Sequence, residues 1–338
     1  MSRRYRTVLA AVLATALAVA ASGCSGSDDK GSSDSNAAPD KVTYLTAFGA
    51  VGRDAFAWVA QEKGYFKDAK LDVTIQLGAA TGENIKALAA GQAQFANLDL
   101  IGAWIVAGKG EAKDFRTIMS VHQQNLVSII ALEGGGITSP KDIEGKTLGA
   151  ATGSVNQLLF PAYAQLAGID TNKVKWQNGT PAQLTPMLVG GQVNALSTFL
   201  IGQKGIEKVA KKKAVVLPYS DYLSDLYGNG IITSSKIAKD DPDLAKRFRD
   251  ASLKGLKYTL EHPEEAVQIL QKAQPTADAT AALGEITLMK PYCGTGAVIG
   301  TLDKQRVARA IATLQANKLI PAGMTPDSVV DFTIAPKA

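Results

Sequence analysis

The side chains that usually carry out nucleophilic and metal chemistry are scarce in this chain. Its 338 residues include two histidines, His122 and His262, and two cysteines, Cys24 and Cys293. A three-histidine zinc site is therefore impossible, and the sequence contains neither a His-Glu-x-x-His motif nor a Gly-x-Ser-x-Gly nucleophile turn. The sequence predicts no metal site and argues against enzymes of these types.

Two glycine-containing stretches resemble nucleotide-binding loops without meeting their requirements. Residues 145–147 (Gly-Lys-Thr) have the order that ends a phosphate-binding loop, but Pro140 stands where the first glycine of that loop is needed. Residues 294–300 miss the glycine spacing of a dinucleotide-binding turn by one residue. We therefore expect no nucleotide and no other organic cofactor.

Residues suited to non-covalent binding follow several of the expected strands. In open α/β sheets, ligands bind beyond the carboxyl ends of the strands, where loops lead into helix N-termini. Aromatic rings can enclose a flat ligand, backbone N–H groups at a helix start can hold an oxygen, and a carboxylate can accept from an amino group. The residues expected to bind a ligand are Phe48, Gly49, Arg53, Asp54, Asp99, Asn125, Thr152, Ser154, Asn156, Phe199, Tyr222 and Tyr227.

Several of these residues have a purely structural alternative. The hydroxyls of residues 152–154 could serve only to cap a helix, and Asp99 could cap the helix that follows it. Arg53 and Asp54 could form a solvated ion pair, worth about 0–1 kcal/mol. Phe48 could belong to the hydrophobic core. The sequence leaves these alternatives open.

From residue 41 onward the chain alternates between strand-like and helix-like patterns. Residues 42–48 alternate and are rich in β-forming residues, whereas residues 54–63 place apolar side chains on one helical face. Such alternation predicts an α/β fold with parallel strands in open sheets. Further strands are expected at 71–77, 95–98, 115–121, 126–132, 147–151, 174–177, 195–199 and 215–218, and helices at 83–90, 101–107, 155–167, 182–189, 206–212, 244–261, 263–273 and 276–289.

The alternating pattern breaks at a Glu-Gly-Gly-Gly stretch, residues 133–136, and a second α/β run follows it. We therefore expect two α/β lobes, the second inserted into the first. Lobe 1 would consist of residues 41–132 and 235–338 and lobe 2 of residues 133–234, with hinge crossings near 132–136 and 225–234.

The first forty residues have the organisation of an export signal followed by a tether. Three arginines precede an apolar run, residues 8–21, which is shorter than the roughly 20 residues that a membrane-spanning helix needs. Small residues directly before Cys24 are typical of a lipoprotein processing site. We expect residues 1–23 to be a lipoprotein signal peptide, Cys24 to carry the lipid, and residues 24–40 to form a flexible polar tether. An ordinary secreted protein with a chance cysteine is the alternative.

The expected export also bears on charge and location. Removal of the signal peptide would lower the formal charge from +5 to +2, so a basic surface for nucleic acid is not expected. No later stretch of the sequence is long and apolar enough to span a bilayer. We therefore expect an extracytoplasmic protein that is anchored to the cell membrane by lipid.

Four stretches of the sequence carry a family resemblance. They are residues 59–67 (VAQEKGYFK), 87–96 (ALAAGQAQFA), 139–149 (SPKDIEGKTLG) and 187–195 (MLVGGQVNA). In this order they resemble the NMT1/THI5-like solute-binding proteins of the nitrate, sulfonate, taurine and thiamine-pyrimidine type. The family often has an acid where Gln94 and Asn194 stand, at two helix-to-strand turns, and we interpret both exchanges as changes of capping.

The resemblance implies a periplasmic-binding-protein fold, in which two hinged α/β lobes close around one small molecule. It also implies ABC permease subunits as partners, and we expect the protein to be a monomer. An exported enzyme and a ligand sensor on the same fold are the alternatives of another class. The related fungal pyrimidine synthase relies on a cysteine-rich motif, and this chain has no comparable motif.

The mixture of aromatic, neutral polar and acidic candidates favours a flat, hydrogen-bonding heterocycle as the ligand. A nitrate or sulfonate site would concentrate donors and positive charge, and among the candidates only Arg53 is suitably placed for that. We therefore predict a pyrimidine-like thiamine precursor. A sulfonate, taurine or nitrate anion and a flavin-like vitamin are the alternatives.

Overall fold

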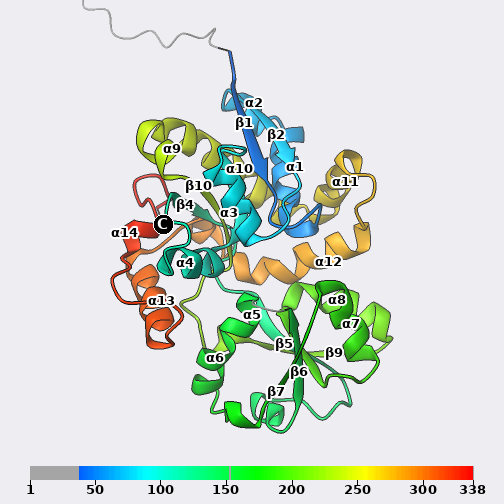
Figure 1. Ribbon diagram of the computed structural model, residues 1–338. Helices are drawn as coiled ribbons and strands as arrows, with labels where there is room; N and C mark the ends of the chain where they lie inside the picture. Colours follow the sequence, from blue (N-terminus) through cyan, green and yellow to red (C-terminus); the bar gives the residue numbers. More distant parts are fainter. Residues whose placement is uncertain (1–37, 152–153, 338) are drawn as a thin grey trace, which may run out of the picture. The chain divides into compact units, whose positions relative to one another are not determined.

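Two five-stranded sheets organise the computed structural model, which describes residues 38–151 and 154–337 (Figure 1). The first sheet has the strand order β2-β1-β3-β10-β4, and the second has the order β7-β6-β8-β5-β9. The strands of the first sheet are β1 (Asp40–Leu45), β2 (Leu71–Gln76), β3 (Phe95–Asp99), β4 (Phe115–Ser120) and β10 (Asn229–Ser234), and those of the second are β5 (Val127–Leu132), β6 (Thr147–Ala151), β7 (Lys175–Gly179), β8 (Ala195–Phe199) and β9 (Ala214–Pro218).

Each sheet combines parallel pairing with antiparallel pairing by one strand. β1 is parallel to β2 and β3, and β6 is parallel to β7 and β8. In contrast, β10 is antiparallel to β3 and β4, and β5 is antiparallel to β8 and β9. Each of these antiparallel strands is the first strand along the chain after it passes from one sheet to the other. The expectation of parallel pairing is therefore wrong for these two strands, because a crossing chain enters the new sheet from its opposite end.

The observed crossings place the lobe boundaries differently from the expected ones. β5 was expected in lobe 1 but pairs in the second sheet, and β10 was expected in the return crossing but pairs in the first. The chain therefore crosses at residues 121–126 and 219–228. The glycines at 134–136 form a turn inside lobe 2, in which Gly134 and Gly136 have positive φ angles of 81° and 73°.

Helices accompany both sheets. The helix expected at 155–167 is divided into two, because Pro161 lies in the first turn of the second piece. The helices of lobe 1 are α1 (Ala55–Glu62), α2 (Tyr65–Asp68), α3 (Thr81–Ala89), α4 (Leu100–Gly108), α9 (Ser235–Asp240), α10 (Pro242–Glu261), α11 (Pro263–Ala273), α12 (Ala279–Met289), α13 (Lys304–Ala316) and α14 (Pro326–Val329), and those of lobe 2 are α5 (Val155–Leu158), α6 (Phe160–Leu166), α7 (Pro181–Val189) and α8 (Gln203–Ala210).

Helix α4 differs from the amphipathic helices because it lacks a polar face. Its sequence, LIGAWIVAG, contains no charged residue, and its buried residues include Trp104 and Ile105. A helix that is apolar all round is stable only when it is packed on several sides. The burial of α4 therefore fixes its N-terminus, where Asp99 joins β3 to the helix.

The predictions for the N-terminus concern residues outside the described part of the chain. Residues 1–37 contain the expected signal peptide, Cys24 and most of the tether. The last residue assigned to the tether, Asp40, already belongs to β1. No helix among the described residues is long and apolar enough to cross a membrane.

Close packing of α10 on α1 gives a test of the first lobe. A Cβ atom on Gly255 would lie 2.3 Å from the Phe56 carbonyl oxygen and 2.9 Å from the Ala60 Cβ atom. We predict that Gly255→Ala lowers the free energy of unfolding by about 1–3 kcal/mol, because the two helices must separate. Urea denaturation measures this change.

The matched control is Gly205→Ala in α8, where a Cβ atom would meet nothing within 4 Å. This exposed helical glycine should give unchanged or slightly higher stability, by about 0.5–1 kcal/mol. Equal effects of the two substitutions would contradict the described helix contact.

Candidate ligand-binding cavity

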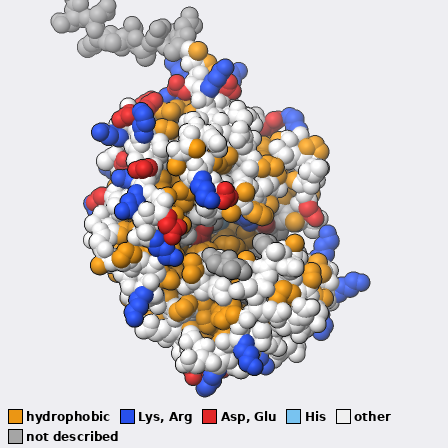
Figure 2. Space-filling model, viewed as in Figure 1, with side chains coloured by type: hydrophobic (Ala, Val, Ile, Leu, Met, Phe, Trp, Pro, Cys, Tyr) orange, Lys and Arg blue, Asp and Glu red, His pale blue; other side chains and the backbone are white. Residues whose placement is uncertain are grey.

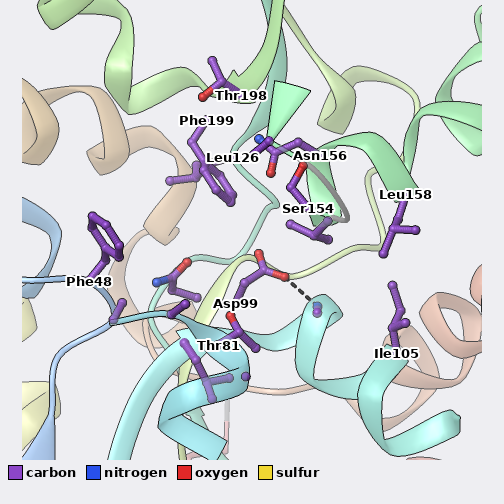
Figure 3. A pocket seen from close by; sticks show the side chains of 18 of the residues that line it. Phe48, Thr81, Asp99, Ile105, Leu126, Ser154, Asn156, Leu158, Thr198 and Phe199 are labelled. Carbon is purple, nitrogen blue, oxygen red and sulfur yellow. Dashed lines mark hydrogen bonds between the residues drawn. The ribbon is translucent and has the colours of Figure 1, made fainter. Parts of the chain in front are cut away.

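A cavity of about 580 Å³ lies between the two lobes. It is visible as a hollow in Figure 2, and Figure 3 shows its walls. Lobe 1 contributes the segment after β1, the start of α3, the end of β3 and one side of α4, and lobe 2 contributes α5 and the end of β8. Strand ends that lead into helix starts are the usual ligand position in α/β sheets, and small-molecule sites typically have volumes of roughly 300–1,000 Å³.

Asp99 is the least exposed charged residue in the cavity wall, with 6% of its surface accessible. Its Oδ1 atom accepts a hydrogen bond of 2.7 Å from the Gly102 backbone N–H and so caps α4 (Figure 3). Its Oδ2 atom accepts a longer bond of 3.3 Å from the Asn125 side chain. Burial raises the pKa of Asp99 to about 6, although hydrogen bonds from Gly102, Asn125 and Ile101 lower it in part. Asp99 is thus both a helix cap and a carboxyl group that reaches the cavity.

The lobe 2 wall of the cavity is neutral in the part of the chain that the structure describes. Its polar residues there are Ser154, Asn156, Ser197 and Thr198, and no charged residue lines it. Ser154 caps α5 by accepting from the Gln157 backbone N–H at 3.4 Å. Asn156 also lines the cavity, and its amide side chain makes no hydrogen bond with another described residue.

Two phenylalanines lie on different sides of the cavity. Phe48 follows β1 in lobe 1 and is 52% exposed; Phe199 ends β8 in lobe 2 and is half-buried. Figure 3 shows both rings bordering the same space. The large exposure of Phe48 contradicts its alternative role in the hydrophobic core. Its neighbour Gly49 does not line the cavity but has a φ of +65° and forms the turn that presents Phe48.

The positive charge in the cavity is largely compensated. Arg53 lies 3.4 Å from Glu285, and both side chains are 16% exposed. The Arg53 backbone N–H also donates to Glu285, at 3.2 Å. Lys109 and Glu111 lie exposed at the cavity edge and carry opposite charges. No concentration of free cations surrounds the cavity in the described structure.

Asp54 is buried and does not line the cavity, so it is not a solvated partner of Arg53. Its Oδ1 atom accepts hydrogen bonds from the Ala47 backbone N–H at 3.0 Å and the Asn97 side chain at 2.8 Å. Burial raises the pKa of this carboxyl group. Asp54 therefore anchors the segment after β1 and does not face a ligand.

Three further residues expected to contact a ligand also lie outside the cavity wall. Asn125 is buried in the first crossing, where its amide bonds Asp99. Tyr222 is 40% exposed and packs edge-on against Tyr163. Tyr227 is buried, and its hydroxyl accepts from the Asp303 backbone N–H at 3.0 Å. Thr152 lies outside the described residues.

The cavity wall also contains residues that the sequence analysis did not single out. Thr81 begins α3, and the same strand-end rule would have indicated it, since it follows β2. Asn229 begins β10 and pairs directly with Asp99; it was missed because β10 was taken for part of a crossing. Leu126 and Ile105 carry no signal beyond their hydrophobicity, so only the structure reveals them.

One of the two histidines, His122, and the described cysteine, Cys293, are buried away from the cavity wall, and His262 is exposed outside it. Burial lowers the pKa of His122 to about 3, and its Nδ1 atom accepts from the Asn229 backbone N–H at 3.2 Å. Burial also raises the pKa of the Cys293 thiol to about 12. The described residues contain no group of three His, Cys, Asp or Glu side chains placed to hold a metal ion.

Two α/β sheets joined by two crossings, with a cavity between them, define the periplasmic-binding-protein fold. Solved structures confirm this expectation. The chain is similar to the periplasmic aliphatic sulphonate-binding protein SsuA from Escherichia coli, with a TM-score of 0.71 and 14% identity over 87% of this chain and 92% of that one. It is also similar to the periplasmic nitrate-binding protein NrtA from Synechocystis PCC 6803, with a TM-score of 0.70 and 13% identity over 88% and 87% of the two chains. At such low identity the likeness shows the fold alone.

The family is shown by the sequence itself. Residues 54–266 match the family model described as NMT1/THI5 like. This match covers more than half of the chain, so the protein belongs to the NMT1/THI5-like family, and the resemblance seen in the four sequence stretches is confirmed.

Three relatives with similar sequences carry names that differ in what they bind or make. A formylaminopyrimidine-binding protein of Halalkalibacterium halodurans is 26% identical over 66% of this chain and 67% of its own length. The riboflavin-binding protein RibY of Chloroflexus aurantiacus is 25% identical over 75% and 72%. A 4-amino-5-hydroxymethyl-2-methylpyrimidine phosphate synthase of Legionella pneumophila is 26% identical over 64% and 68%.

The raised pKa of Asp99 predicts a specific dependence of stability on pH. A carboxyl group whose pKa is about 6 in the folded protein stabilises the fold below its unfolded pKa of about 4, and this contribution is lost as the pH rises through 6. Asp99→Asn keeps the helix cap and removes the titration. We predict that the unfolding free energy of Asp99→Asn relative to wild type increases by on the order of 2–3 kcal/mol between pH 4 and pH 7.5.

Chemical denaturation at several pH values measures this difference. Because both proteins share every other titrating group, those groups cancel in the comparison. A difference that stays constant over this range would show that Asp99 ionises as it does in water.

Proposed function

We propose that this protein is the extracytoplasmic solute-binding protein of an ABC importer. We further propose that its ligand is a flat heterocycle with an amino group, and that this ligand is a pyrimidine-like thiamine precursor. The observation that carries the proposal is the buried Asp99 carboxyl group, which reaches a cavity bordered by Phe48 and Phe199. A carboxylate accepts hydrogen bonds from an exocyclic amino group, and aromatic rings stack on the faces of a flat ring.

The charge of the cavity disfavours an anion such as a sulfonate, taurine or nitrate. Arg53 is paired with Glu285, and the described part of the lobe 2 wall carries no charge. An anion would meet the Asp99 carboxylate without a free buried cation to offset the repulsion. In this proposal, the protein shares its fold with sulfonate- and nitrate-binding proteins but binds a different class of ligand.

A flavin-like vitamin is the second candidate, favoured by the size of the cavity. About 580 Å³ exceeds the space that a single small ring needs, and one relative is named as a riboflavin-binding protein. The name of the formylaminopyrimidine-binding relative and the carboxylate at the cavity floor support the smaller aminopyrimidine.

Closure of the two lobes would complete the proposed site. The neutral hydroxyl and amide groups of Ser154, Asn156 and Thr198 would approach the ligand from lobe 2, and exclusion of water would strengthen their hydrogen bonds. The closed monomer would then dock on its permease subunits. Lipidation at Cys24 would keep the protein at the outer face of the cell membrane.

We propose binding without catalysis, although one relative is named as a pyrimidine phosphate synthase. His122 and Cys293 are buried outside the cavity wall, and Asp99 is held as a helix cap. A ligand sensor on the same fold would bind in the same way, and disruption of a neighbouring permease gene would separate the two functions because only an importer loses uptake.

A calorimetric panel tests the ligand class. The panel contains aminopyrimidines, riboflavin, taurine, an alkanesulfonate and nitrate, and we expect an aminopyrimidine to bind most tightly. Phe48→Ala and Phe199→Ala should each weaken this binding by about tenfold, because each removes a stacking ring worth roughly 0.5–1.5 kcal/mol beyond its buried area.

Tyr222→Ala is the matched control, since this exposed aromatic residue lies outside the cavity wall. Its affinity should stay within about twofold of wild type, well below the tenfold step of 1.4 kcal/mol. Tight binding of an alkanesulfonate together with no response to any aromatic compound would refute the proposed ligand.

The protonation of Asp99 predicts how binding depends on pH. The amino group of the ligand needs the carboxylate form, which is depleted as the pH falls through about 6. Binding should therefore be roughly tenfold weaker at pH 5 than at pH 8. The measurement uses an aminopyrimidine whose ring nitrogen stays unprotonated over this range.

The Asp99→Asn variant should bind weakly and without this pH dependence. A wild-type affinity that is the same at both pH values would argue against a contact between the ligand and the Asp99 carboxylate.

A further inference from the structure

Asn125 occupies the first crossing and uses all its side-chain hydrogen-bonding groups within the protein. Its side chain N–H groups donate to Asp99 Oδ2 at 3.3 Å and to the Tyr227 carbonyl oxygen at 3.0 Å. Its Oδ1 atom accepts from the Val127 backbone N–H at 2.8 Å. With 1% of its surface accessible and no place in the cavity wall, Asn125 directs these bonds to the protein and not to a ligand.

The three partners of Asn125 belong to the first sheet, the second sheet and the second crossing. Asp99 ends a strand of the first sheet, Val127 begins β5 of the second sheet, and Tyr227 lies in the second crossing. A backbone bond from Asn125 to the Leu226 carbonyl oxygen, at 2.9 Å, adds another link between the two crossings. One side chain thus joins the carboxyl group in the cavity to both segments that connect the lobes.

We infer that Asn125 is a positioning residue that orients Asp99 toward the ligand and couples occupancy of the cavity to the arrangement of the two crossings. This inference rests on the proposed function, because it needs Asp99 to contact the ligand. A ligand that draws on Asp99 Oδ2 competes with the longest of the three Asn125 bonds. The remaining bonds of Asn125 hold both crossings, so its amide group links Asp99 to the hinge in addition to the strand pairing of Asp99 with Asn229.

The charged groups around Asp99 do not offer another explanation for its orientation. Arg53, Lys109 and Glu111 line the same cavity, and Arg53 is paired with Glu285. The buried Asp54 is held by Asn97 and the chain after β1, and His122 bonds the backbone of Asn229. The described cavity wall of lobe 2 presents no charged group. Asp99 is thus oriented by hydrogen bonds from Gly102 and Asn125 and not by an ion pair.

Asn84 provides a closely matched control elsewhere in lobe 1. It is 2% exposed, and its amide donates to the carbonyl oxygens of Thr46 at 2.8 Å and Asn97 at 3.0 Å. Its Oδ1 atom accepts from the Ala79 backbone N–H at 3.3 Å. Asn84 therefore makes three side-chain hydrogen bonds, as Asn125 does, but none of them reaches Asp99 or either crossing.

The experiment compares Asn125→Ala, Asn125→Ser and Asn84→Ala with wild type in the full-length protein. Both Asn125 variants should weaken aminopyrimidine binding by about tenfold or more and move the pH midpoint of binding upward, since the bond from Asn125 lowers the pKa of Asp99. Small-angle scattering should show less compaction on ligand addition. Asn84→Ala should lose stability but keep the pH midpoint of binding and the compaction at saturating ligand, because Asn84 bonds neither Asp99 nor either crossing.

A second measurement needs no ligand and separates the inference from the proposed function. The titration of the Asp99 carboxyl group, followed by carbon NMR, should shift upward in the Asn125 variants and remain unchanged in Asn84→Ala. Unchanged titration and binding in both Asn125 variants would overturn the inference while leaving the proposed function intact. Failure of wild type to bind any heterocycle, with the titration shifted as expected, would refute the proposed function and the coupling but confirm that Asn125 positions Asp99.

Discussion

A single buried carboxyl group imposes the main constraint on this structure. Asp99 lies where β3 ends and α4 begins, and burial of a carboxyl group at such a position costs free energy that hydrogen bonds to its oxygens offset. The backbone of α4 bonds one oxygen and Asn125 bonds the other. The apolar character of α4 contributes to the same end, because burial of the whole helix fixes the N–H groups that face Asp99.

The exchange of strands between the sheets explains why the cavity has two unlike walls. β10 comes from the second crossing and places Asn229 beside Asp99 in the first sheet. β5 comes from the first crossing and pairs with β8, which ends at Phe199. The first crossing contributes Leu126 to the cavity wall, and the second leads into Asn229 of the wall. Lobe 1 supplies the charge of the cavity, while the described part of lobe 2 supplies neutral hydroxyl, amide and aromatic groups.

The sequence predicts much of the fold, and about half of the residues that it places at the ligand line the cavity. Strand ends are recognisable from local patterns, and six of the twelve residues expected near the ligand line the cavity: Phe48, Arg53, Asp99, Ser154, Asn156 and Phe199. For Asp99 and Ser154 the structural alternative is also correct. Each caps a helix and lines the cavity at once, because the helix starts themselves form the wall.

Predictions that depend on distant contacts were less successful. The pairing of β5 and β10 is decided by the opposite sheet, and no local pattern reports it; this error displaced the lobe boundaries and hid Asn229. Tyr227 was expected at the ligand, but Arg306 of the distant helix α13 lies 4.1 Å from its ring centre. The burial of Asp54 likewise depends on Asn97, a residue of a neighbouring strand.

A crystal structure of the protein with a bound aminopyrimidine tests the central claim most directly. We expect the ring between Phe48 and Phe199, with its amino nitrogen within hydrogen-bonding distance of Asp99 Oδ2. A ligand bound away from Asp99, or an anion bound at Arg53 in its place, would show that Asp99 does not determine the ligand.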